Sequence, residues 1–494
     1  MKRVGFDSAK YIRLQSERIR ERIDQFGGKL YLEFGGKLFD DYHASRVLPG
    51  FEPDNKIKML LELKDQAEIV IAISAGDIEK NKRRGDLGIT YDTDVMRLID
   101  IFRGFGLYVG SIVLTQYAEQ PSAATFAKRM TALGLKVYRH YHIPNYPSDI
   151  KLVVSEEGFG RNDYIETTRS LVVVTAPGPG SGKMATCLSQ LYHEHKRGVK
   201  AGYAKFETFP IWNLPLKHPV NLAYEAATAD LNDVNMIDPY HLEAYGETTV
   251  NYNRDIEVFP IVRTILNRIL GEDLYRSPTD MGVNMAGFAI ADDEVCREAS
   301  RQEVLRRYYK SFCDCRLGTA DKEVPGRIEL VMQQLGIKAD DRAVVYPARK
   351  RAEECGRPAT TIMLRDGRMV TGRMSELMTA PASALINAVK LLAGMSDSLH
   401  LLSPLVLEPI LHTKRDILHA TPSRMSVSEI LIAMSICAAT NPMVELAMSK
   451  LTELSGCDAH STVILSDADT NALRKLGLNL TCDPEFYANE FYTE

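Results

Sequence analysis

The sequence predicts a multi-domain α/β protein built around a mostly parallel sheet. The chain has 494 residues, which exceeds one ordinary domain and, at roughly 150 residues per domain, suggests about three. Along residues 1–222, apolar runs alternate with amphipathic stretches, a pattern that indicates strands separated by helices. Several of these runs are apolar at consecutive positions, as is typical of parallel strands covered on both faces.

Each element of this first part follows from its local pattern. Residues 96–106 and 123–134 carry apolar side chains at steps of three and four and end in glycine, as expected of helices that cover a sheet. The strands between such helices are expected at 29–34, 68–74, 106–115, 136–143, 151–154, 170–176 and 200–206.

The second part, residues 223–335, is predicted to be mainly helical. Helical periodicity is present in 257–271 and in 292–312. The polar stretch 242–259 is interpreted as an extended arm.

The third part, residues 336–494, is predicted to be a C-terminal α/β domain. Asp366-Gly367 is a favoured two-residue turn, so 361–372 is expected to form a hairpin. A helix is expected over 375–394, where Pro381 requires a kink or a later start. The remaining elements are a helix pair in 426–454 broken at Asn441-Pro442, a strand at 461–466 and a helix at 467–477.

Composition excludes several classes of protein. A net charge of −5 provides no general basic field, so nucleic acid is not expected as a partner. No apolar run reaches the ~18 residues of a membrane span, and the first residues do not resemble a secretory signal, so no membrane partner is expected. Eight sparse, irregularly spaced cysteines predict free thiols and a cytoplasmic location.

The most informative segment is a glycine-rich loop between an apolar run and a helix, LVVVTAPGPGSGKMATCLSQLYHEH (171–195). Gly178, Gly180 and Gly182 can adopt positive φ and allow the backbone to approach a ligand closely. Backbone N–H groups at a helix start, together with the helix dipole, favour an anion, and Lys183 adds a full positive charge. A phosphate-binding site is therefore predicted over 176–186.

The loop departs from the standard nucleotide-binding pattern G-x-x-x-x-G-K-[ST]. Pro177 occupies the position of the first glycine, and Met184 that of the hydroxyl residue that binds Mg²⁺. Thr186 cannot take the place of the missing magnesium-binding hydroxyl residue, because it lies two helix positions after Met184, which rotates its side chain by about 200° around the helix axis. Ser181 could approach a ligand from the loop. The G-x-G-x-G spacing also misses the dinucleotide pattern. One alternative is a tight turn in which the glycines serve only packing.

Polar residues after two other strands extend the candidate site. Arg83 and Arg84 would clamp a second anionic group, while Asp77 and Asp41 are the candidates for proton or metal chemistry. The alternative for 78–94 is a solvated charged loop. Histidine and cysteine spacings match no metal site, and the sequence leaves the cofactor unknown.

Several long segments resemble an uncharacterised bacterial protein family of unknown function. They are NDYIETTR (162–169), VVVTAPGPGSGK (172–183), LSQLYHE (188–194), AGYAKFETFPIWNLPLKHPVNLAYEAATADL (201–231) and HSTVILS (460–466). The resemblance spans nearly the whole chain and implies a multi-domain α/β protein. It implies no activity and no catalytic residue. It also implies that the departures at Pro177 and Met184 are a family trait.

Two hypotheses follow. The first is an enzyme that acts on a phosphorylated small molecule or nucleotide bound at the loop. The second is a non-catalytic ligand-sensing or scaffolding protein with a regulatory anion site. The alanine-rich helices at 380–394 and 430–440 indicate close helix packing, and a homo-oligomer is expected.

Overall fold

The computed structural model describes residues 4–36, 38–39, 41–84, 88–420 and 423–487. The chain folds into two compact units. The first consists of Arg3–Glu225 and Asn232–Ser300, and the second mainly of Ala226–Leu231 and Arg301–Glu494.

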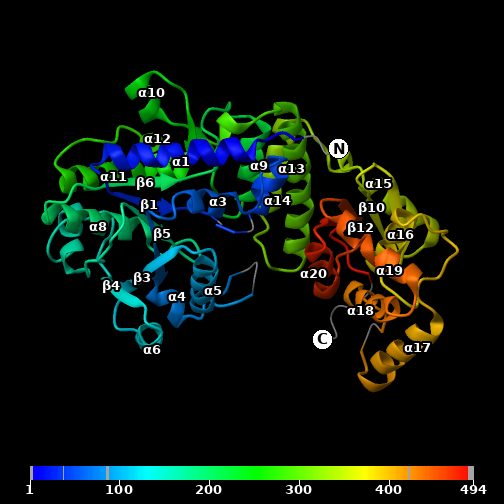
Figure 1. Cartoon of the computed structure of the whole chain (residues 1–494). Coiled ribbons are helices and arrows are strands. Elements are labelled where there is room, and N and C mark those ends of the chain that lie inside the picture. Colours follow the sequence, from blue (N-terminus) through cyan, green and yellow to red (C-terminus); the bar gives the residue numbers. More distant parts are fainter. Residues whose placement is uncertain (1–3, 37, 40, 85–87, 421–422, 488–494) are drawn as a thin grey trace. The chain divides into compact units, whose positions relative to one another are not determined.

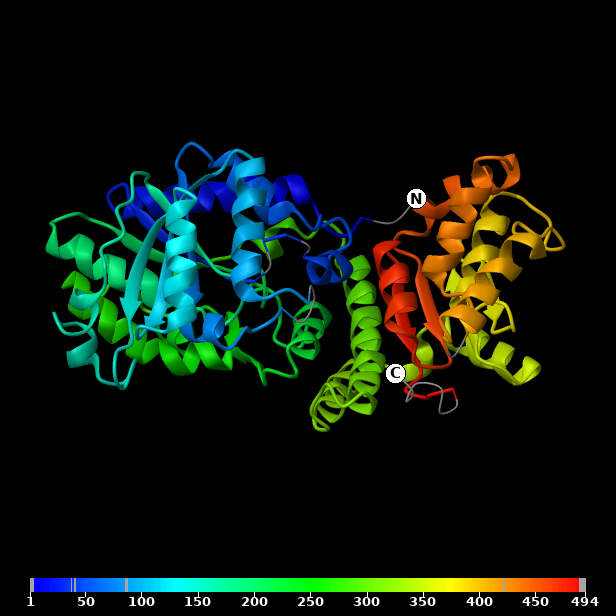
Figure 2. The same cartoon turned by 90° about the horizontal axis from the view of Figure 1, so that it is seen from below.

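The first unit is built on a seven-stranded sheet with the order β4-β3-β2-β5-β1-β6-β9, in which every neighbouring pair is parallel (Figures 1 and 2). This confirms the predicted α/β class. Strands β1, β2 and β5 are buried at every position, as their consecutive apolar residues require. The strands are β1 (Leu30–Phe34), β2 (Ala67–Ser74), β3 (Tyr108–Tyr117), β4 (Lys136–Tyr141), β5 (Leu171–Thr175), β6 (Gly202–Phe206) and β9 (Gly282–Val283).

Helices and a small ribbon complete this unit. Helix α8 (Lys183–Lys196) packs on β1, β5 and β6 and against α11 (Asn253–Leu270). The others are α1 (Ser8–Gln25), α2 (Tyr42–Val47), α3 (Asn55–Glu62), α4 (Ala75–Glu79), α5 (Tyr91–Gly104), α6 (Pro121–Ala132), α7 (Ile150–Val153), α9 (Pro219–Ala227), α10 (Pro239–Tyr245) and α12 (Pro278–Met281). Strands β7 (Asn235–Ile237) and β8 (Val250–Tyr252) form the antiparallel ribbon.

The strand order places a switch point between β2 and β5. From β2 the chain continues to β3 on one side of the sheet, whereas from β5 it continues past β1 to β6 on the other side. Ligands of open α/β sheets bind beyond the carboxyl ends of the strands at such a point. The glycine-rich loop follows β5, and α4 follows β2, so both lie at this point.

Two expectations for this unit were wrong. Residues 151–154 form no strand; most of them lie in α7, whose first N–H groups are capped because the Asp149 side chain accepts a hydrogen bond from the N–H of Leu152. A four-residue apolar run does not distinguish a buried helix turn from a strand. Residues 242–259 form no extended arm, since they contain the end of α10, strand β8 and the start of α11.

The second unit contains a four-stranded sheet with the order β11-β10-β12-β13. The predicted hairpin is confirmed, because β10 (Ala359–Met363) and β11 (Met369–Arg373) are antiparallel and Gly367 has a φ of 85° in the turn. The other two strands are β12 (Asp458–Ser461) and β13 (Asn479–Cys482). Strand β12 thus starts three residues before, and ends five residues before, the strand expected at 461–466.

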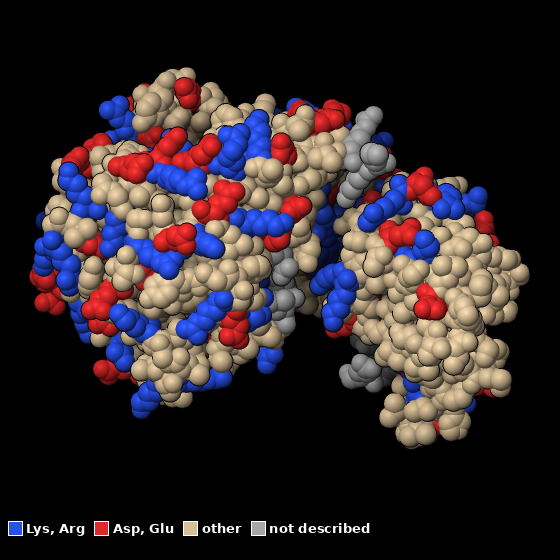
Figure 3. Space-filling model, in the orientation of Figure 1, with Lys and Arg blue, Asp and Glu red and all other residues tan. Residues whose placement is uncertain are grey.

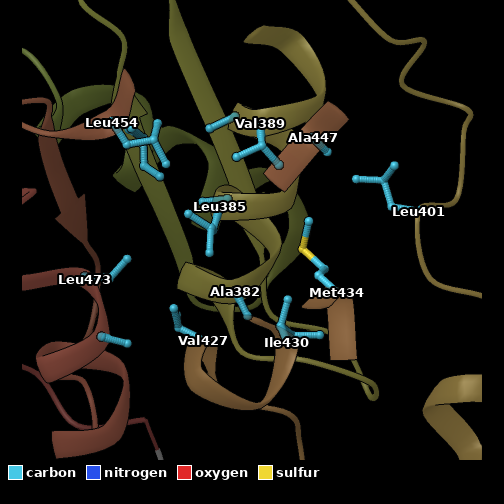
Figure 4. Close-up of a cluster of buried hydrophobic side chains, with 14 of the residues drawn as sticks. Ala382, Leu385, Val389, Leu401, Val427, Ile430, Met434, Ala447, Leu454 and Leu473 are labelled. Atoms are coloured by element: carbon cyan, nitrogen blue, oxygen red, sulfur yellow. The ribbon is translucent and has the colours of Figure 1, made fainter. Parts of the chain in front are cut away.

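Helix α16 (Ala380–Leu392) forms the centre of this unit's core. It begins with Pro381 in its first turn, which resolves the expected conflict by a later start. It packs on β10 and β11 and on α18 (Val427–Ala438) and α19 (Pro442–Ser449), the pair broken at Asn441-Pro442 as predicted. Figure 4 shows Leu385 and Val389 of α16 in this core with Ile430 and Met434 of α18. The remaining helices are α14 (Val324–Leu335), α15 (Val345–Cys355), α17 (Pro404–His412), α20 (Asp467–Lys475) and the part of α13 (Asp293–Arg316) that follows Ser300.

Among the residues that the structure describes, no helix has the length and apolar character needed to cross a membrane.

Candidate functional site

The glycine-rich loop connects the buried end of β5 to the first turn of α8. Gly180 and Gly182 have φ angles of 75° and 82°, in the left-handed region that favours glycine. Gly182 is also the N-cap of α8. The sequence prediction of a strand, a glycine turn and a helix start is therefore confirmed in detail.

The three glycines have different local roles. A Cβ atom on Gly178 would lie 2.2 Å from the Tyr91 hydroxyl oxygen, so this glycine allows close packing against the start of α5. A Cβ on Gly182 would lie 3.0 Å from the Thr115 side chain, whereas one on Gly180 would face open space. The packing alternative thus applies to Gly178 and in part to Gly182, while Gly180 serves only the turn.

Two hydroxyl groups hold the loop in shape. The buried Ser181 Oγ donates a hydrogen bond to the carbonyl oxygen of Gly178 at 2.9 Å. Thr115 Oγ1, at the end of β3, donates to the carbonyl oxygen of Ser181 at 2.8 Å. Ser181 therefore contributes to the loop's internal structure, and its hydroxyl proton is directed at Gly178.

The first backbone N–H groups of α8 have no hydrogen-bond acceptor within the described part of the chain. No side chain caps the helix, and the N–H groups of Lys183, Met184 and Ala185 have no acceptor among the described residues. The half-buried Lys183 ammonium likewise forms no ion pair or hydrogen bond within the described part of the chain. Thr186 is buried and its hydroxyl donates to the Gly182 carbonyl at 2.9 Å, so it does not supply the missing magnesium ligand.

A cavity of about 220 Å³ adjoins this helix start. Gly182 and Ala185 line it on the side of α8, and Thr115 and Tyr146 are among the residues that line it elsewhere. Its volume lies below the roughly 300–1,000 Å³ of drug-sized ligand sites. The cavity therefore suits a phosphate group or a small fragment rather than a larger ligand. The other lining residues are Gln116, His140, Tyr141, His142, Ile143, Asn145, Phe159 and Asn162.

Burial shifts the pKa values of two residues that line the cavity, His140 and Tyr146. Burial lowers the pKa of His140 to about 3, and its Nε2 lies 3.2 Å from the carbonyl oxygen of Asp163. His140 is therefore neutral at pH 7, and its ring holds the Asp163 backbone in place. Enclosure also raises the pKa of Tyr146, with smaller contributions from Glu33 and Cys187.

Asp77 is connected to the loop indirectly, through Lys82 and Tyr91. Its carboxylate pairs with Lys82 at 3.3 Å, and the Lys82 ammonium lies 5.1 Å from the centre of the Tyr91 ring. The hydroxyl of the same ring abuts Gly178. Asp77, in α4 after β2, thus has Lys82 and Tyr91 between its carboxylate and the loop.

The other predicted residues are engaged elsewhere. Arg83 is exposed and donates to the carbonyl oxygen of Gly88 at 2.9 Å, and Arg84 pairs with buried Asp94 at 2.8 Å. Asp41 caps α2 and pairs with Lys56 at 2.8 Å. Burial raises the pKa of the Asp41 carboxyl, but Lys56, His43 and the Ala44 N–H together outweigh it, so the pKa lies below its ordinary value. None of the three lines the cavity.

A charged group that the site prediction omitted lies at the ends of β1 and β6. Lys205 Nζ lies 2.7 Å from Glu207 Oε1 and 2.5 Å from Asp255 Oδ2 on α11. On β1, Glu33 accepts a hydrogen bond of 2.6 Å from the Tyr203 hydroxyl. The available sequence signal was the presence of charged residues inside otherwise apolar strands. Within the described ranges, no His, Cys, Asp and Glu group has the arrangement of a metal site.

Comparison with known proteins identifies the relatives of this chain. Residues 4–336 match the family model described as the N-terminal domain of unknown function DUF1846, and residues 340–492 match the corresponding C-terminal model. The chain belongs to the DUF1846 family. This membership confirms the resemblance to an uncharacterised bacterial family noted from the sequence.

Curated relatives match over their full length. A UPF0371 protein from Streptococcus thermophilus is 57% identical over 492 residues, and one from Streptococcus pneumoniae is 56% identical over 492 residues. In both cases 100% of each chain is covered. The names of these DUF1846-family relatives state no activity, so the function must be inferred from the site.

Proposed function

We propose that the first unit binds a phosphate-containing small molecule or nucleotide at the loop 176–186. The observation that carries the proposal is the start of α8, where the N–H groups of Lys183, Met184 and Ala185 and the Lys183 ammonium all lack a partner among the described residues. Such a concentration of unsatisfied donors, reinforced by the helix dipole, favours an anion. The adjoining cavity supplies room for it.

The ligand mode differs from that of a standard Mg-ATPase. Pro177 and Met184 stand where the first glycine and the magnesium hydroxyl are required, and Thr186 bonds back to Gly182. We therefore propose binding through backbone N–H groups and Lys183 rather than through a Walker-type magnesium site.

An enzyme acting on the bound ligand is the favoured version of this proposal. Asp77 is its candidate for proton transfer, because Lys82 and Tyr91 connect it to the loop. Arg83, Arg84 and Asp41 stay as further candidates, and each would have to exchange a present partner for the ligand. The alternative is a non-catalytic sensing or scaffolding role for the same anion site.

A thermal-shift screen of nucleotides and sugar phosphates, with and without Mg²⁺, tests the binding proposal. A ligand at 100 times its Kd adds about 2.7 kcal/mol to the free energy of unfolding. Lys183→Ala should abolish the shift. Lys196→Ala, at the other end of α8 in an exposed pair with Glu156, should leave it unchanged. A shift of equal size in both variants would refute the role of the loop.

The second unit offers an observation that favours self-association. Leu405 of α17 is 83% exposed, and Ile432 and Ile436 of α18 are 61% and 67% exposed. Figure 3 shows few charged side chains on the visible face of this unit. Uncharged, apolar surfaces of this kind mark interaction sites. We propose that a second copy of the chain covers the surface of α17, α18 and α19, which gives a homo-oligomer.

A further inference from the structure

The cavity beside α8 extends from the start of this helix to the end of strand β4. On the α8 side it is lined by Gly182, the N-cap, and by Ala185, whose N–H group has no acceptor among the described residues. On the β4 side it is lined by His140 and Tyr141. A molecule whose anionic group lies at the start of α8 therefore has this cavity as the space for its remaining atoms.

The His140 side chain offers the cavity one hydrogen-bond acceptor. It is only 4% exposed, and its Nε2 lies 3.2 Å from the carbonyl oxygen of Asp163. Because a carbonyl oxygen only accepts, Nε2 carries the proton. Burial lowers the pKa of His140 to about 3, so the ring is neutral and Nδ1 is an unprotonated acceptor. This Nδ1 has no hydrogen-bond partner within the described part of the chain.

The unpartnered Nδ1 of His140 indicates a missing hydrogen-bond donor. Buried polar groups normally have partners, and His140 is buried and lines the cavity. A phosphate group at the start of α8 is a poor source of this donor, because it is largely dianionic at pH 7 and its oxygens accept hydrogen bonds. The donor therefore belongs to another part of the ligand, as a hydroxyl or an N–H group.

Aromatic side chains form much of the remaining cavity wall. The buried Phe159 ring lies next to that of Tyr146, with 6.5 Å between the ring centres, and Ile143 adds apolar surface. Aromatic side chains contact other flat rings in offset or edge-to-face arrangements. The volume of about 220 Å³ favours a single ring over a full nucleotide.

The two sides of the cavity are joined by Asn162, which is itself buried. Its side-chain oxygen accepts a hydrogen bond of 2.8 Å from the Tyr141 N–H on β4, and its Nδ2 donates to Ser189 Oγ on α8 at 3.0 Å. Strand β4 and helix α8 are thus held at a fixed separation. A cavity of fixed shape lowers the entropic cost of ordering a ligand.

We propose that this cavity binds the ring of a small aryl phosphate, whose phosphate lies at the start of α8 and whose ring carries a hydroxyl or N–H group that donates to His140 Nδ1. This inference rests on the proposed function and names the ligand class for the same site. The phosphate accepts hydrogen bonds from the backbone N–H groups of α8 and from Lys183. The ring contacts Phe159 and Tyr146.

Calorimetric titration of the full chain with inorganic phosphate, phenyl phosphate and the meta- and para-hydroxyphenyl phosphates tests the inference. We expect phenyl phosphate to bind about tenfold more tightly than inorganic phosphate, because its ring leaves water for an apolar cavity. At least one hydroxyphenyl phosphate should bind about fivefold more tightly than phenyl phosphate, which is the effect of one additional hydrogen bond.

His140→Phe keeps a ring in the cavity wall and removes Nδ1. It should abolish the advantage of the hydroxyphenyl phosphates over phenyl phosphate and leave the affinity for inorganic phosphate unchanged. His195→Phe, at an exposed position near the other end of α8, is the matched control and should change none of the affinities. Should His140→Phe not fold, Ala185→Leu fills the cavity from α8 and should remove the advantage of all three aryl phosphates over inorganic phosphate.

The outcomes separate this inference from the proposed function. If the aryl phosphates bind no more tightly than inorganic phosphate, the cavity does not hold a ring although the loop binds phosphate. If the advantage of the hydroxyphenyl phosphates is absent from the unmodified chain, or survives in His140→Phe, His140 is not the acceptor and the inference is wrong. If none of the four compounds binds the unmodified chain, both proposals fail.

Discussion

Thr115 and Ser181 join the ends of two strands that are not neighbours in the sheet. The Thr115 hydroxyl, on β3, donates a hydrogen bond of 2.8 Å to the carbonyl oxygen of Ser181 in the loop that follows β5. This bond is buried and fixes the loop beside the cavity that Thr115 also lines. The position of the candidate phosphate site thus depends on one side chain from outside the loop.

Thr115→Val should therefore destabilise the protein and loosen the loop. The variant keeps the side-chain shape but leaves the Ser181 carbonyl without this donor, at a cost of about 1–3 kcal/mol. Thr125→Val is the matched control, because Thr125 is exposed and its hydroxyl only bonds back to Pro121 within α6. Urea denaturation measures the difference, and equal stabilities of the two variants would contradict the assigned role.

Glycine-to-alanine substitutions should separate backbone strain from packing in the loop. Gly180→Ala places a side chain at positive φ in open space, which costs about 1–2 kcal/mol. Gly182→Ala should cost more, because its new methyl group also meets Thr115. Gly326→Ala, inside α14 with nothing near its Cβ position, should be neutral or stabilising. Thermal unfolding gives the order, and a Gly180 variant less stable than the Gly182 variant would refute this account.

The sequence was sufficient to predict the main sheet and the loop because both depend on local signals. Strands β1, β2 and β5 are largely apolar and fully buried, and the glycines precede a helix whose first charged residue is Lys183. Residues 151–154 show the limit of this reasoning, since four apolar residues fit a helix turn as well as a strand.

The candidate site was less predictable because its geometry depends on strand order. Tyr91 at the start of α5 meets Gly178 in the loop after β5, two segments that are far apart in the sequence, and the parallel pairing of β2 with β5 lies beneath them. Lys205 and Glu33 likewise face each other through the pairing of β1 with β6. No spacing in the sequence encodes these neighbours, so this charged group could not be assembled before the fold was known.

Glu207 should make the stability of the protein depend on pH. Burial raises the pKa of Glu207 to about 7, with Asp255 and Glu33 adding to the rise and Lys205 opposing it. Between its ordinary value of 4.5 and about 7, the folded state retains a proton that the unfolded state releases. The contribution of Glu207 to the free energy of unfolding therefore falls with rising pH, by up to about 1.4 kcal/mol per unit.

Glu207→Gln removes this contribution. The free energy of unfolding of the variant, minus that of the unmodified chain, should increase from pH 4.5 to pH 7 and be constant above pH 8. Urea denaturation at several pH values measures the difference. Two parallel curves across this range would show that Glu207 titrates at an ordinary pKa.

The exposed face of α18 should decide the oligomeric state. Ile432 and Ile436 lie one turn apart on this helix, which carries a single charged residue, Glu429. Two copies that pair such faces would remove apolar area from water, whereas charges placed there would have to be desolvated without a partner. Light scattering coupled to gel filtration should therefore detect an oligomer of the unmodified chain and a monomer of the Ile432→Glu/Ile436→Glu double variant.

Leu330→Glu, at a 58% exposed position on α14, is the control that should preserve the oligomer. A monomeric unmodified chain at all concentrations, or an oligomer that survives the double substitution, would exclude the α18 surface as the interface.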